Sequence, residues 1–188
     1  MNNESIGANK KIGVGLFLQV LLLAVALVLT IVAIVKSRDV NRLIIYIGQA
    51  VTCAFFIFYF VCHLKKTTTK HFKWTIYSYA VLEALRASLL HTENVPAVAG
   101  YLARFILIAA TCTCILFANR CDEPGSIKMV YGILVLEIIV YAIFLIAFPG
   151  VLLGNFNRFL PFVGVLIAGS LILFQRARIK QMNSYNYN

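Results

Sequence analysis

Four charged residues, Glu83, Arg86, Arg104 and Glu137, lie inside long apolar stretches of this sequence. Glu83 and Arg86 are three residues apart, so on a helix they share one face. Charged side chains are costly inside a bilayer, and they normally face the interior of a helix bundle, where they pair or bind a ligand. These residues therefore indicate a buried polar site in a membrane protein.

Further polar side chains accompany the four charges at helical spacing. Tyr79 lies four residues before Glu83, and Tyr141 lies four residues after Glu137. At a rise of ~1.5 Å per residue, the four charges and Gln49 fall near the middle of a hydrocarbon core of ~30 Å. Carboxylates, guanidinium groups, phenols and an amide in one layer would suit a small polar or zwitterionic solute. The predicted binding residues are Glu83, Arg86, Arg104 and Glu137, with Gln49, Tyr79 and Tyr141 as supporting contacts.

A structural alternative stands beside this prediction. The four charges could pair with one another, for example Glu83 with Arg104 and Glu137 with Arg86, and so hold the helices together. Burial of ion pairs is weak as a source of stability, because desolvation can exceed the Coulomb gain. A narrower hypothesis gives Glu137 a proton-coupled role, because it has no basic residue near it on its own segment. Its alternative is that an arginine from another segment keeps Glu137 ionised.

The elements that position these residues are six apolar segments. The chain has 188 residues, of which 61% are hydrophobic and 13% charged, and a mean hydropathy of +0.87. A soluble domain of this size could not bury so much apolar surface. We predict an all-α, multi-pass integral membrane protein that forms a single bundle of six transmembrane helices over residues 12–180. The predicted spans are about 12–35, 43–62, 74–90, 96–118, 129–148 and 159–175.

The segment at about 74–90 is the least apolar, because Glu83 and Arg86 each cost roughly 2.5–3.5 kcal/mol near the centre of a spanning helix. The charge distribution favours its spanning the membrane. With six spans and an internal N-terminus, eleven lysines and arginines fall on the inner side and four on the outer side. Without this span, each side carries eight. Because basic loops stay in the cytoplasm, we predict cytoplasmic tails at 1–11 and at 181–188, the latter disordered.

Other function classes lack support in the sequence. The net charge of +10 is explained by a cytoplasmic face against anionic lipid headgroups rather than by nucleic acid. There is no nucleotide-binding glycine loop, no H-E-x-x-H and no G-x-S-x-G. Cys62, His63, His71 and Cys121 would share the inner side, but no pair has zinc-site spacing. We therefore predict no enzymatic activity, no cofactor and no metal.

In layout, the sequence resembles the small substrate-binding membrane subunits of energy-coupling vitamin importers. Those subunits also have six helices, short loops, an internal N-terminus and no ATPase of their own. The resemblance covers architecture and not residues. The first segment lacks the clear small-x-x-x-small pattern that those subunits use for docking, and Ala26 and Thr30 come closest to it.

Two functional hypotheses follow. The first is a cell-membrane protein that binds or transports a small polar or zwitterionic solute, as the membrane subunit of a larger transporter or as a homo-oligomer. The second is a non-transporting assembly, immunity or sensory subunit, whose buried charges pair internally or with a partner's helix. Charge exchange between paired positions discriminates them, because a structural network tolerates it and a ligand site does not.

Overall fold

The computed structural model describes residues 3–64, 71–89, 96–147 and 159–185, and the side chains of 14–62, 71–89, 96–147 and 162–180. These residues form helices and short turns and contain no β-strand, so the all-α prediction is confirmed. The helices are α1 (Asn3–Lys36), α2 (Val40–Leu64), α3 (His71–Leu89), α4 (Ala97–Arg120), α5 (Ile127–Ala147) and α6 (Phe159–Tyr185). One 3₁₀ turn, η1 (Pro124–Ser126), precedes α5.

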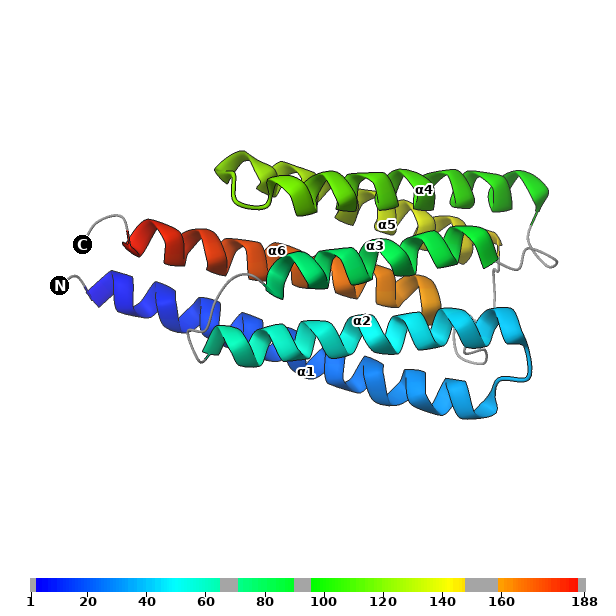
Figure 1. Ribbon diagram of the computed structural model, residues 1–188, viewed down its shortest axis with the longest axis horizontal. Helices are drawn as coiled ribbons and strands as arrows, with labels where there is room; N and C mark the ends of the chain where they lie inside the picture. Colours follow the sequence, from blue (N-terminus) through cyan, green and yellow to red (C-terminus); the bar gives the residue numbers. More distant parts are fainter. Residues whose placement is uncertain (1–2, 65–70, 90–95, 148–158, 186–188) are drawn as a thin grey trace.

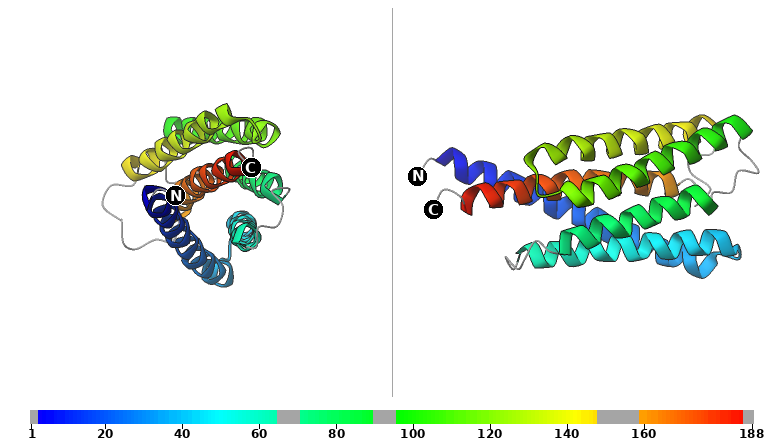
Figure 2. Two further views of the ribbon diagram at one scale, coloured as in Figure 1. Left: turned by 90° about the vertical axis from the view of Figure 1, so that its left-hand side faces the viewer. Right: turned by 45° about the horizontal axis from the view of Figure 1, so that its top comes forward.

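Consecutive helices run antiparallel, so both ends of the chain lie at the same end of the bundle (Figure 1). Each helix packs against the next one in the sequence, and α6 returns to pack against α1. Figure 2 shows α6 between the α4–α5 pair and the α1–α2 pair. The central position of α6 explains why its buried residues lie on most of its circumference.

Five helices in the described part of the chain are long and apolar enough to cross a membrane, namely α1, α2, α4, α5 and α6. Their outer faces carry large exposed apolar side chains, among them Val98, Phe105 and Ile146. Such a continuous apolar surface requires lipid or another apolar partner. The remaining helix, α3, has 19 residues and is less apolar than these five. It packs between α2 and α4 as part of the same bundle.

The helix ends differ from the predicted spans where polar residues extend a helix. α2 begins at Val40, because a side-chain oxygen of Asp39 accepts hydrogen bonds from the backbone N–H groups of Asn41, at 2.9 Å, and Arg42, at 3.4 Å. α6 continues to Tyr185, past the expected disordered start at residue 181. The residues after Gln175 include Arg, Ala, Lys, Gln and Met, all good helix formers. Residues 1–2 and 186–188 of the predicted tails lie outside the described residues.

An aromatic cluster joins α6 to α2 in the core. The ring of Phe174 is fully buried, and its centroid lies 5.1 Å from that of Tyr59, 5.9 Å from Phe56 and 6.4 Å from Phe60. These separations are typical of favourable tilted or edge-to-face aromatic pairs. The cluster therefore fixes α6 against α2.

A polar cluster holds α6 at the end of the bundle where the termini lie, and we call it the α6 clasp. Gln175 donates to the carbonyl oxygen of Cys121 at 2.8 Å and to the hydroxyl of Ser126 at 3.0 Å. Arg178 donates to the same carbonyl at 3.1 Å and forms an ion pair with Asp122. The clasp thus provides partners for the Cys121 carbonyl, the Ser126 hydroxyl and the Asp122 carboxylate, where the chain turns from α4 into α5.

We expect Phe174→Ala to lower the free energy of unfolding by about 3–5 kcal/mol, because it leaves a cavity among three aromatic rings. Phe105→Ala removes the same group from a side chain that is 70% exposed on α4, and it should have little effect. Thermal unfolding in detergent, followed by circular dichroism, measures both. Equal losses in the two variants would contradict the described core.

Candidate functional site

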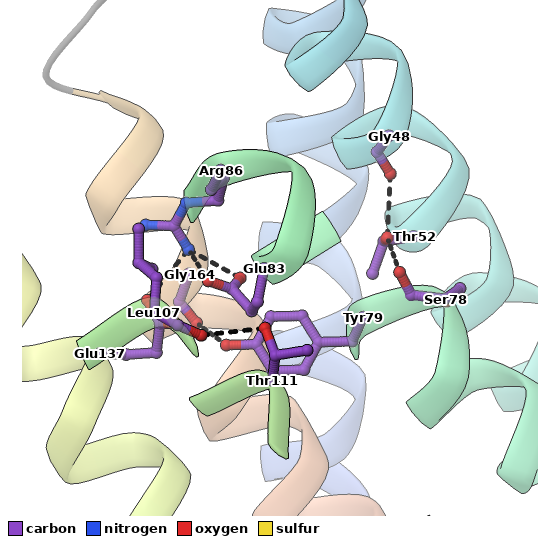
Figure 3. A network of polar contacts seen from close by, with 10 residues as sticks. All are labelled: Gly48, Thr52, Ser78, Tyr79, Glu83, Arg86, Leu107, Thr111, Glu137 and Gly164. Atoms are coloured by element: carbon purple, nitrogen blue, oxygen red, sulfur yellow. Dashed lines mark hydrogen bonds and ion pairs between the residues drawn. The ribbon is translucent and has the colours of Figure 1, made fainter. Parts of the chain in front are cut away.

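Three of the four charged residues meet in one cluster, which we call the ion cluster (Figure 3). Nη1 of Arg86 donates to both carboxylate oxygens of Glu83, each at 2.7 Å, and to Oε2 of Glu137 at 3.1 Å. Glu83 and Arg86 are one turn apart on α3, whereas Glu137 comes from α5. One guanidinium nitrogen therefore links two carboxylates on two helices.

The ion cluster is closed off from the surface. The exposed fractions are 0% for Glu83, 2% for Arg86 and 0% for Glu137. Hydrogen bonds to charged groups are stronger than those between neutral groups, and a low-dielectric interior strengthens them further. Removal of one member would leave the others buried without compensation, which is strongly destabilising. The cluster is thus both an anchor between α3 and α5 and a costly feature to bury.

The backbone of α6 completes the site through Gly164. A side-chain Cβ at this position would lie 2.9 Å from Cδ of Glu137, and closer still to its Oε2 and to Nη1 of Arg86. The absence of a side chain is therefore what lets Arg86 reach Glu137 beside α6. The hydroxyl of Tyr79, from α3, donates to the carbonyl oxygen of Gly164 at 3.3 Å.

Two polar atoms of the ion cluster make no hydrogen bond within the described residues. Nε of Arg86 and Oε1 of Glu137 are buried and have no hydrogen-bond partner in the part of the chain that the structure describes. One is a donor and the other an acceptor. Buried polar atoms of this kind normally have a partner, so the ion cluster has one donor and one acceptor available to a further polar group.

Two other predicted site residues, Gln49 and Tyr141, make contacts outside this cluster. Gln49 is buried, but its amide donates to the hydroxyl of Thr30 on α1 at 2.5 Å, which links α2 to α1. Tyr141 packs its ring against that of Phe162, with centroids 6.2 Å apart. Arg104 is half-buried on α4.

The observed pairing also differs from the example that the sequence raised. Glu137 pairs with Arg86, as in that example, and Glu83 pairs with Arg86 as well. The physical reason is proximity, because Arg86 lies one turn from Glu83 on the same face of α3. Gly164 was not recognised from the sequence, since a glycine in an apolar segment carries no sign of what it lies against.

The hydrogen bonds that link α1 to α6 could not be predicted from a local sequence pattern either. Gln19 of α1 donates to the carbonyl oxygen of Leu166 at 2.9 Å and to the hydroxyl of Ser170 at 3.0 Å, both on α6. A lone glutamine in the first apolar segment was the only signal for this link. His63, considered above as a metal ligand, has a side chain outside the described residues.

Comparisons with protein-family models, with curated proteins and with solved structures find no match for this chain. The interpretation of the ion cluster therefore rests on its geometry and chemistry.

Gly164→Ala should destabilise the protein by about 1–3 kcal/mol, the usual cost of overpacking, because its methyl group would displace Glu137 or Arg86. Gly169→Ala on the same helix is the matched control, since a Cβ there meets no atom nearer than 3.8 Å. Because alanine favours helix over glycine, Gly169→Ala should be neutral or stabilising. Thermal unfolding of both variants tests the close approach, and equal behaviour would rule it out.

Proposed function

We propose that all six helices cross the cell membrane and that both ends of the chain are cytoplasmic. The support is the antiparallel arrangement, the position of α3 between two apolar helices, and the larger number of basic residues assigned to one side. A helix that brings Glu83 and Arg86 to the bundle interior can cross a bilayer without presenting either charge to lipid.

We further propose that this protein binds and transports a small polar or zwitterionic solute through the ion cluster. The observation that carries the proposal is the pair of unfilled buried atoms, the donor Nε of Arg86 and the acceptor Oε1 of Glu137. An ammonium group fits the acceptor, and a carboxylate or other anionic oxygen fits the donor. A zwitterion supplies both charges and leaves the net charge of the site unchanged.

The free-energy cost of burying the ion cluster supports the same proposal. Well-packed apolar residues of similar volume often stabilise a protein at least as well as a buried ion pair. Intramembrane charges are therefore functional by default. A chain of this size would complete a transport pathway with a second copy or with a partner protein in the membrane.

A second candidate function is a non-transporting assembly or sensory subunit. The internal pairing of Arg86 with Glu83 and Glu137 favours it, because a network that satisfies most of its own charge can serve as a link between helices. In that case the unfilled atoms would receive a group from a partner's helix.

Site-directed labelling tests the six-span topology. In a cysteine-free variant, Ala97→Cys at the start of α4 should react with a membrane-impermeant maleimide in intact cells. His71→Cys at the start of α3 should react only after permeabilisation, because α3 separates the two positions. Glu123→Cys, in the turn between α4 and α5, is the control for the inner side. If positions 71 and 97 label from the same side, α3 does not cross the membrane.

Native mass spectrometry of the protein, extracted gently from its host membrane, tests the solute site. The wild-type protein should carry a bound small molecule. The neutral triple variant Glu83→Gln/Arg86→Met/Glu137→Gln should lose it and remain folded, because all members of the charge network are replaced together. The variant Arg120→Met/Glu123→Gln makes the same kinds of change at exposed positions, and it should keep the ligand. A wild-type protein without ligand but with a stoichiometric partner would instead support the assembly function.

A further inference from the structure

Three exposed cations and a tyrosine lie on α5 and α6, at the end of the bundle where the termini lie. Lys128 is in the first turn of α5, and Arg176 and Lys180 are one turn apart in the C-terminal half of α6. Arg176 donates a hydrogen bond to the hydroxyl of Tyr131 on α5, and its guanidinium carbon lies 5.7 Å from the centroid of that ring. We call these four residues the basic patch.

The antiparallel packing of α5 and α6 arranges the basic patch in two levels (Figure 1). Lys128 lies three residues before Tyr131, and Lys180 lies four residues after Arg176, so each lysine shares a face with its neighbour. Because the two helices run in opposite directions, both lysines are one turn nearer the end of the bundle than Arg176. The patch therefore presents one guanidinium group below two ammonium groups.

The basic patch has no carboxylate partner among the described residues. The described acidic side chains at this end of the bundle are Asp122 and Glu123. Asp122 pairs with Lys73, at 3.6 Å, and with Arg178, and no described ion pair joins either acid to the patch. Lys128 also stands at the N-terminus of α5, where the helix dipole favours a negative group. The patch is thus suited to an anion from outside the chain.

An apolar strip of α6 leads from the basic patch toward the opposite end of the bundle. It consists of Phe162, Val165, Gly169 and Leu173, which are at least partly exposed and lie three or four residues apart in line with Arg176. We call these four residues the α6 strip. One face of α6 is therefore apolar over most of its length and cationic at its end.

The α6 strip lies between α1 and α5. Gln19 of α1 bonds to Leu166 and Ser170 on one side of it. Tyr141 of α5 packs against Phe162 on the other side. The described parts of α1 and α5 both pack on α6 but hardly touch each other. The described helices therefore leave the strip uncovered.

The dimensions of this face match one leaflet of a bilayer. From position 162 to position 173 the helix rises ~16 Å, about half of a hydrocarbon core of ~30 Å. A guanidinium group binds phosphate oxygens through several N–H groups at once, and lysines add positive charge. Basic groups between helices on the cytoplasmic side are typical binding sites for anionic headgroups.

We propose that α5 and α6 form a binding site for one anionic phospholipid of the cytoplasmic leaflet, with its phosphate at the basic patch and an acyl chain along the α6 strip. A zwitterionic phospholipid binds less well, because its own ammonium group is repelled by the cations of the patch. The proposal rests on the membrane insertion and the cytoplasmic ends proposed above, and it is independent of the solute site.

Native mass spectrometry of the delipidated protein tests this proposal, with phosphatidylglycerol and phosphatidylcholine of the same acyl chains as probes. The wild-type protein should retain one phosphatidylglycerol and bind phosphatidylcholine more weakly. Lys128→Gln/Arg176→Gln should lower the affinity for phosphatidylglycerol about 30-fold, since each lost cation weakens attraction to an anionic headgroup about fivefold. Its affinity for phosphatidylcholine should change much less.

Lys36→Gln/Arg38→Gln is the matched control, because it removes the same two kinds of cation at exposed positions on the opposite end of the bundle. This variant should bind phosphatidylglycerol like the wild-type protein. Thermal unfolding verifies that both variants fold, as expected for changes at exposed side chains. Equal losses of affinity in the two variants would overturn the proposal, since binding would then follow net charge and not a site.

Inorganic phosphate distinguishes a lipid from a soluble phosphate compound. If an acyl chain lies on the α6 strip, inorganic phosphate at matched ionic strength should not displace phosphatidylglycerol. Displacement by inorganic phosphate, or equal retention of the two lipids by the wild-type protein, would overturn the proposal.

The lipid site and the solute site have separate outcomes. The neutral triple variant Glu83→Gln/Arg86→Met/Glu137→Gln should keep phosphatidylglycerol, because the ion cluster is buried away from the basic patch. Specific retention of phosphatidylglycerol by a protein that never carries a solute would uphold the lipid site while the proposed transport function fails.

Discussion

A single nitrogen of Arg86, shared between carboxylates of α3 and α5, is the interaction on which the rest of this structure depends. It turns the charged face of the least apolar helix toward the interior of the bundle, where Glu83 and Arg86 pair and are buried. Once α3 turns this face inward, its outward face can be apolar, and it fits between α2 and α4. The placement of α3 thus follows from charge pairing more than from its own hydropathy.

The same interaction sets a steric requirement on α6. Arg86 and Glu137 meet where a side chain on position 164 would stand, so the central helix must offer bare backbone there. The carbonyl oxygen of Gly164 then accepts a hydrogen bond from the hydroxyl of Tyr79, so α3, α5 and α6 meet at one point. Ten residues further along α6, ~15 Å away, the core is packed with large side chains, among them Phe174 against α2. The polar centre and the aromatic core therefore stabilise the same helix from two sides.

Much of this arrangement could be predicted from the sequence, and the remainder has identifiable physical reasons. Long apolar runs predict the helices, and the three-residue spacing of Glu83 and Arg86 predicts their common face. Depth alone, however, does not say which way a side chain points around its helix. Gln49 and Tyr141 share the predicted layer but make their contacts outside the ion cluster. The role of Gly164 depends on contacts between distant segments, which no local pattern encodes.

The α6 clasp has a mechanical consequence. Gln175 and Gly164 are eleven residues apart on one continuous helix, a separation of ~16 Å. The clasp fixes the Gln175 end to the turn between α4 and α5 through two hydrogen bonds. The clasp and the ion cluster therefore act on one rigid element, and the room beside Arg86 and Glu137 depends on the position in which the clasp holds α6.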